Sequence, residues 1–136
     1  MDKQPNNLPE LIETATEMLD RAYVPYSKFP VGAALHTNEG EVFSGCNIEN
    51  ASFGLTNCAE RTAVFKAVSE GKKDFDYLVV TGDTDGPISP CGACRQVLVE
   101  FCEPEMPVLL TNRNGDKHFT TVQELLPGYF KSADMV

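Results

Sequence analysis

The residues best suited to carry out chemistry form two short groups. Cys58-Ala59-Glu60 is followed further along the chain by Pro90-Cys91-Gly92-Ala93-Cys94. Three thiolates can bind Zn²⁺ and leave one tetrahedral position for water, which is typical of catalytic rather than structural zinc sites. Glu60 is then not needed as a ligand and is free to act as a general base toward that water. The spacing therefore favours an enzyme with one zinc ion per chain, held by the three cysteines.

Both groups lie where the sequence predicts the start of a helix. The unpaired N–H groups and the positive dipole end of a helix favour a thiolate over a thiol, so all three ligands are placed where their charged form is stabilised. Cys91 and Cys94 share a helix face, since they are three residues apart. In a first helical turn, Cys58 and Glu60 can also face a common point.

Charge is a difficulty for such a site, because three thiolates overcompensate the two positive charges of zinc. A net negative centre works against lowering the pKa of a bound water. Arg61, directly after Glu60, is the first candidate to offset this charge by donating to a cysteine sulfur, and Arg95, next to Cys94, is the second.

Hydrophobic periodicity predicts the elements that must position these residues. Apolar side chains spaced by three and four predict a first amphipathic helix, and Gly40 marks the turn of a hairpin between the first two strands. The alternation of strands and helices indicates a layered α/β sheet, antiparallel at the hairpin and parallel around the two cysteine-bearing helices. The predicted helices cover 8–23, 58–69, 91–101 and 121–126, and the predicted strands cover 31–37, 41–47, 77–81, 108–111 and 117–120.

Composition limits the class of protein. A chain of 136 residues, 42% of them hydrophobic, predicts a single domain over 1–136. The formal net charge of −9 and the lack of any basic run argue against nucleic-acid binding. No apolar run approaches the ~20 residues that span a bilayer, and the N-terminus does not resemble a signal peptide. Five cysteines, an odd number, favour free thiols and metal ligation in a reducing compartment over a disulfide framework, so we expect a cytoplasmic protein. The acidic charge favours a small-molecule substrate, and the lack of a long apolar run argues against a membrane partner.

Several motifs together resemble the cytidine deaminase family, in its short form with three cysteine ligands. The two cysteine groups match the signature of zinc deaminases, in which the glutamate is not a ligand. The resemblance extends from Tyr23 to about Phe130, and its motifs lie at 26–29, 31–34, 45–51, 58–63 and 90–96. It implies a three-layer α/β/α cytidine deaminase-like fold with a mixed five-stranded sheet.

The same resemblance implies a reaction. Cytidine and 2′-deoxycytidine would be hydrolysed to the uridines with release of ammonia, in pyrimidine salvage. Glu60 would take a proton from water, pass it to N3 of the pyrimidine and protonate the departing amine.

The resemblance also implies a substrate site. Asn47 and Glu49 would bind the ribose 3′-OH, Phe29 would stack on the pyrimidine, and the backbone near Ala59 and Ser89 would contact the polar edge of the ring. A carboxylate at the sugar accepts from a hydroxyl and repels a phosphate, so a nucleoside is favoured over a nucleotide.

Short members of this family form homotetramers in which a neighbouring subunit completes each site, and the resemblance implies the same here. Phe130 is the expected apolar contribution across the interface. Phe53 stands where many relatives have tyrosine, so a hydroxyl contact from that position is in question.

Other interpretations stay open on the sequence alone. A deaminase of the same fold could act on another aminopyrimidine nucleoside, such as blasticidin S. A noncatalytic zinc or redox protein could use Cys91 and Cys94 structurally, with Cys46 or Cys102 as a closing ligand, although each is more simply a small buried residue. Without the resemblance, Phe29 and Phe53 could be core aromatics, and Asn47 and Glu49 ordinary loop residues. His36 and His118 are expected outside the site.

Overall fold

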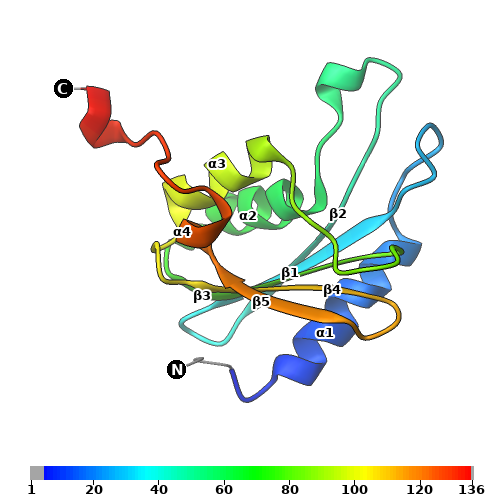
Figure 1. Ribbon diagram of the computed structural model, residues 1–136, viewed down its shortest axis with the longest axis horizontal. Coiled ribbons are helices and arrows are strands. Elements are labelled where there is room, and N and C mark those ends of the chain that lie inside the picture. Colours follow the sequence, from blue (N-terminus) through cyan, green and yellow to red (C-terminus); the bar gives the residue numbers. More distant parts are fainter. Residues whose placement is uncertain (1–4, 136) are drawn as a thin grey trace.

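Five strands form one mixed sheet in the order β2-β1-β3-β4-β5. The structure is a computed structural model that describes residues 5–135. Helices cover both faces of the sheet (Figure 1). The strands are β1 (Val31–Thr37), β2 (Val42–Cys46), β3 (Phe75–Gly82), β4 (Pro107–Asn112) and β5 (Lys117–Thr121). The α-helices are α1 (Leu8–Glu17), α2 (Ala59–Ser69), α3 (Gly92–Phe101) and α4 (Val122–Leu125), and the 3₁₀ turns are η1 (Met18–Asp20), η2 (Phe53–Leu55) and η3 (Ser132–Met135).

Strand directions refine the prediction. β1 pairs antiparallel with β2 on one side and with β3 on the other, β3 pairs parallel with β4, and β4 pairs antiparallel with β5. The strands that flank α2 therefore run in the same direction, but β1 lies between them. The predicted parallel arrangement around the two cysteine-bearing helices is therefore confirmed for the strand directions, and only around α3 are the two flanking strands also hydrogen-bonded neighbours.

Alternation along the strands divides the core between the two faces. Ala34 points toward α1, whereas Ala33 and Leu35 point toward α2 and α3. The α1 face also buries Leu8, Leu11, Ala15, Tyr77, Val79 and Leu109. The opposite face buries a larger set that includes Ala63, Val64, Leu78, Val80, Leu98, Val108 and Val122. This is the expected three-layer α/β/α arrangement.

Two glycines let the helices approach the sheet closely. A Cβ at Gly32 would lie 2.0 Å from the carbonyl oxygen of Ala15 in α1, and one at Gly45 would lie 2.4 Å from the carbonyl oxygen of Ala59 in α2. Side chains at these strand positions would push the helices away. The absence of a side chain at Gly45 therefore allows the first turn of α2, which follows Cys58, to pack directly against β2.

The first helix is shorter than predicted. α1 ends at Glu17, and a 3₁₀ turn continues it to Asp20. Tyr23 leaves the helical path because its backbone pairs with the segment after β2, donating to Asn47 O at 3.0 Å and accepting from Glu49 N at 2.9 Å. A long-range pairing thus overrides the local helical periodicity. Within residues 5–135, every helix is too short or too polar to cross a lipid bilayer.

Candidate active site

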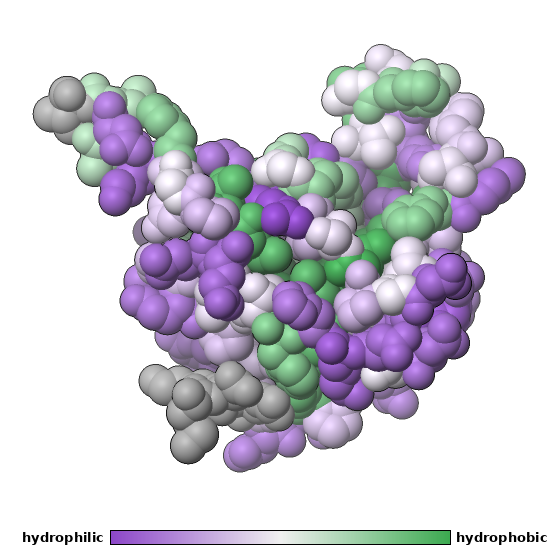
Figure 2. All heavy atoms as spheres, viewed as in Figure 1, coloured by the Kyte–Doolittle hydropathy of each residue, from purple (hydrophilic) through white to green (hydrophobic). Residues whose placement is uncertain are grey.

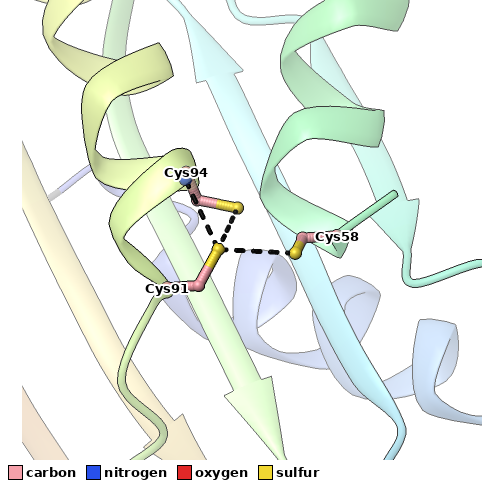
Figure 3. A group of neighbouring side chains, drawn as sticks. All are labelled: Cys58, Cys91 and Cys94. Atoms are coloured by element: carbon pink, nitrogen blue, oxygen red, sulfur yellow. Dashed lines mark hydrogen bonds between the residues drawn. The ribbon is translucent and has the colours of Figure 1, made fainter. Parts of the chain in front are cut away.

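Three thiols converge between the starts of α2 and α3. The sulfur of Cys91 lies 3.5 Å from that of Cys58 and 3.4 Å from that of Cys94. All three sulfur atoms lie within 4.8 Å of one another, and Figure 3 shows the side chains pointing toward a common centre. Among the described residues this is the one group of three or more potential metal ligands.

The helix starts explain the convergence. Cys58 and Cys91 are the N-cap residues of α2 and α3, and both have extended backbone where the chain enters the helix. The sulfur of Cys91 accepts from the backbone N–H of Cys94 at 3.5 Å, as a capping side chain does. Two helices that begin side by side on one face of the sheet thus bring together ligands from distant parts of the chain.

Arg61 is the residue that places a positive charge against the thiols, as its position after Glu60 predicted. Its Nη2 donates to the sulfur of Cys58 at 3.2 Å. Hydrogen bonds from the Cys94 thiol and from Arg61 lower the pKa of Cys58 to about 5, and the same Cys58–Cys94 hydrogen bond raises the pKa of Cys94. The cluster therefore favours thiolate at Cys58, the form in which cysteine binds zinc.

Glu60 lies beside the thiols in the first turn of α2. Its side chain is buried, with 3% of the residue exposed. Burial raises the pKa of its carboxyl to about 7, because a low-dielectric environment disfavours the charged form. A carboxyl with a pKa near neutrality can both accept and donate a proton, as a general acid and base must.

Arg95 has a different role from the one considered for it. Its guanidinium donates to Pro90 O at 2.9 Å, to Leu125 O at 2.6 Å and to Ser89 Oγ at 2.6 Å. It is therefore committed to holding the loop before Cys91 against the end of α4. Arg61, and not Arg95, donates to a cysteine sulfur.

Asn47 and Glu49 hold the loop that carries Phe29. The buried amide of Asn47 accepts from Val31 N at 2.9 Å and donates to Phe29 O at 2.8 Å. Glu49 Oε1 accepts from the backbone N–H groups of Tyr26 at 3.0 Å and Ser27 at 3.1 Å. Phe29 is 44% exposed, so it is not a core aromatic. Hydrogen bonds thus bring the three residues into one neighbourhood, and their role in binding a nucleoside stays a prediction.

Comparison with known proteins decides the family. The family model described as the cytidine and deoxycytidylate deaminase zinc-binding region matches residues 5–110. This chain belongs to the cytidine deaminase family. A cytidine deaminase of Sporosarcina psychrophila is 57% identical over 129 residues, which cover 95% of each chain. One of Halalkalibacterium halodurans is 56% identical over 125 residues, covering 92% of this chain and 95% of the relative.

Solved structures agree with this assignment. The crystal structure of cytidine deaminase from Burkholderia pseudomallei superposes with a TM-score of 0.88 and 54% sequence identity, covering 90% of this chain and 98% of that one. The expected family and fold are confirmed. The donor set itself fits zinc, since three thiols gather within bonding reach of one ion and leave a position open.

Two further aromatics lie on projecting segments. Phe53 in η2 is 75% exposed and stands edge-to-face with Tyr26, with ring centroids 6.2 Å apart. Phe130 is 58% exposed, and its carbonyl oxygen accepts from Gln96 Nε2 at 2.9 Å. Figure 2 shows hydrophobic side chains on both projections, and neither ring belongs to a core cluster of the described residues.

The remaining cysteines and histidines lie outside the thiol cluster. Cys102 is buried, and Cys46 is half-buried with its thiol donating to Arg21 O at 3.5 Å. Neither belongs to the group of three thiols, so neither is placed to act as a fourth ligand. His36 is buried against Asp76, and His118 is exposed on β5.

One residue that contacts both Glu49 and Phe29 was not singled out from the sequence. Ser27 Oγ donates to Glu49 Oε2 and accepts from Phe29 N at 3.0 Å. A serine in a polar loop carries no signal of its own. Its place within the motif at 26–29 is the one feature of the sequence that could have pointed to it.

Proposed function

We propose that this protein hydrolyses cytidine and 2′-deoxycytidine to uridine and 2′-deoxyuridine with release of ammonia, using one zinc ion per subunit. The observation that carries the proposal is a buried carboxyl, Glu60, directly beside a cluster of three thiols. Cys58, Cys91 and Cys94 would hold the metal. When bound, zinc would act as a Lewis acid and lower the pKa of a water molecule.

Glu60 performs the proton transfers. It accepts a proton from the water that attacks C4 of the pyrimidine and delivers it to N3. The attacking oxygen then gives its second proton, through Glu60, to the exocyclic amine, and the C4–N bond breaks to release ammonia. Water and cytidine are consumed and uridine and ammonia are formed, with Glu60 returned to its starting state.

The nucleoside is held by the residues around the Phe29 loop. Phe29 stacks on the pyrimidine, and Asn47 and Glu49 bind the ribose 3′-OH. The support is that these three residues are linked by hydrogen bonds in one neighbourhood. Backbone groups near Ala59 and Ser89 contact the polar edge of the ring. A carboxylate at the sugar repels phosphate, which favours nucleosides over nucleotides.

The protein acts in pyrimidine salvage as a homotetramer of single-domain subunits, spanning 1–136. The exposed rings of Phe53 and Phe130 support assembly, because large apolar side chains on projections are typical of subunit contacts. Phe130 and Phe53 line the site in this arrangement. We place the enzyme in the cytoplasm, where ligand thiols stay reduced. Nucleic acid and membranes are not partners.

A substrate panel tests the proposal. Ammonia release is measured with cytidine, 2′-deoxycytidine, CMP, adenosine and blasticidin S, alongside metal analysis of the purified protein. We expect activity on the first two and about one zinc per chain. The Cys91→Ser variant should lose both zinc and activity, while Cys46→Ser, outside the cluster, keeps both. Full activity without zinc, or a preference for blasticidin S over cytidine, would contradict the proposal.

A further inference from the structure

We propose that Ser27 is a positioning residue of the nucleoside site, whose hydroxyl sets the place of the Glu49 carboxylate and of the Phe29 backbone together. This inference rests on the proposed function and deepens it. Ser27 would contribute to sugar binding through Glu49, whose carboxylate its hydroxyl contacts.

The hydroxyl of Ser27 acts both as a hydrogen-bond donor and as an acceptor. It donates to Glu49 Oε2 and accepts from the backbone N–H of Phe29 at 3.0 Å. A serine hydroxyl has one proton to donate, so the donor is committed to Glu49. One group therefore joins the residue proposed to bind the ribose to the residue proposed to stack on the base.

Glu49 is fixed by this loop and still has capacity for a ligand. Its other oxygen accepts from the N–H groups of Tyr26 and Ser27, at 3.0 and 3.1 Å. An ionised carboxylate offers about four acceptor positions, and these three donors leave one for a sugar hydroxyl. The hydrogen bond from Ser27 also keeps the pKa of Glu49 below its ordinary value, so the acceptor form is the one presented.

The loop needs such a tie because its backbone is unusual. Lys28, between Ser27 and Phe29, has a φ of 58°, in the left-handed region that non-glycine residues rarely adopt. It is the one non-glycine residue with positive φ within the described part of the chain. A backbone of this kind persists when its surroundings hold it, and such residues cluster at functional sites. The Ser27 hydroxyl spans Lys28 and holds this turn.

Ser27 is exposed, so its truncation leaves no cavity in the core. The buried amide of Asn47 still holds the far side of the loop through Phe29 O and Val31 N. Loss of the hydroxyl should therefore disturb the position of Glu49 without unfolding the protein.

Steady-state kinetics with two nucleosides test the proposal. Cytidine and 3′-deoxycytidine are compared in the zinc-loaded wild type, Ser27→Ala and Ser27→Thr. We expect Ser27→Ala to raise KM for cytidine about tenfold, as for loss of a hydrogen bond to a charged group, with kcat within about twofold. KM for 3′-deoxycytidine, which lacks the hydroxyl that Glu49 binds, should change less than about threefold. Ser27→Thr, which keeps a hydroxyl, should restore the wild-type ratio.

Ser69→Ala is the matched control. That hydroxyl also lies on the surface and donates to a backbone carbonyl, Lys66 O at 2.7 Å, in the last turn of α2. It should leave both KM values unchanged. An equal rise of KM for the two nucleosides in Ser27→Ala, or no recovery in Ser27→Thr, overturns the positioning role. If the wild type releases ammonia from neither nucleoside, the proposed function fails and this inference fails with it.

Discussion

Arg61 donates to the sulfur of Cys58 at 3.2 Å from three residues further along the same helix. The helix that supplies a thiol ligand therefore also supplies a positive charge against it. A centre of three thiolates is negative with zinc bound, so a guanidinium hydrogen-bonded to one sulfur withdraws charge from the ligand set. This relationship explains how three cysteines can still serve an enzyme that must activate water.

Replacing Arg61 by alanine should therefore slow the reaction without removing the metal. We expect zinc content to stay near one per chain and kcat to fall about 10–100-fold, the range typical of groups that support metal ligands. Kinetics and metal analysis on the same preparation provide the measurement. Arg113→Ala is the control, since Arg113 forms surface ion pairs with Asp20 and Asp83. An unchanged kcat in Arg61→Ala would mean that the charge is offset elsewhere.

Glu60→Gln should separate proton transfer from metal binding. The amide cannot carry the proton, so we expect turnover to fall by about 10²–10⁴ while zinc remains bound. Glu13→Gln, an exposed position on α1, should behave as wild type. If Glu60→Gln turned over at a rate near that of wild type, another group would have to be the proton shuttle.

Because β2 and α2 pack closely at Gly45, a larger side chain at this position should affect both stability and activity. In Gly45→Ala the new Cβ would lie 2.4 Å from Ala59 O and 2.6 Å from Ala63 N. Overpacking of this kind should lower the free energy of unfolding by about 1–3 kcal/mol and displace the first turn of α2, reducing kcat/KM. Urea denaturation and kinetics measure the two effects. Gly86→Ala, with no atom within 4 Å of the added Cβ, should change neither; equal stability of the two variants would contradict the packing argument.

The tie between Glu49 and its loop should depend on pH. Hydrogen bonds from Ser27 and Tyr26 hold the pKa of Glu49 below its ordinary value of 4.5, so the folded state favours the ionised form. The stabilisation from a lowered carboxyl pKa is present above the ordinary value and disappears as the pH falls through the folded-state pKa. The difference in free energy of unfolding between wild type and Glu49→Gln should be constant above about pH 6 and shrink below about pH 4.5. Denaturant titrations across this range, with Glu13→Gln as control, measure it; a difference that grows toward acid would contradict the sign.

Much of the site was accessible from residue types and spacing. The three cysteines and Glu60 follow from the chemistry of zinc ligands, and Arg61 follows from the excess negative charge that they create. Local periodicity also gave the helix starts at Cys58 and Cys91, because N-cap positions and apolar spacing are properties of neighbouring residues. The roles of Asn47, Glu49 and Phe29 came from resemblance, since nothing in a polar loop distinguishes a ligand-binding residue from a surface one.

The sequence by itself determined which groups could do the chemistry, because ligand type and charge balance are properties of the side chains. The tertiary structure decided what those groups touch. Only the folded chain shows that Arg61 rather than Arg95 contacts a thiol, and that Ser27 joins Glu49 to Phe29. These relationships depend on pairings between segments far apart along the chain, such as Tyr23 with the segment after β2, and no local pattern specifies such contacts.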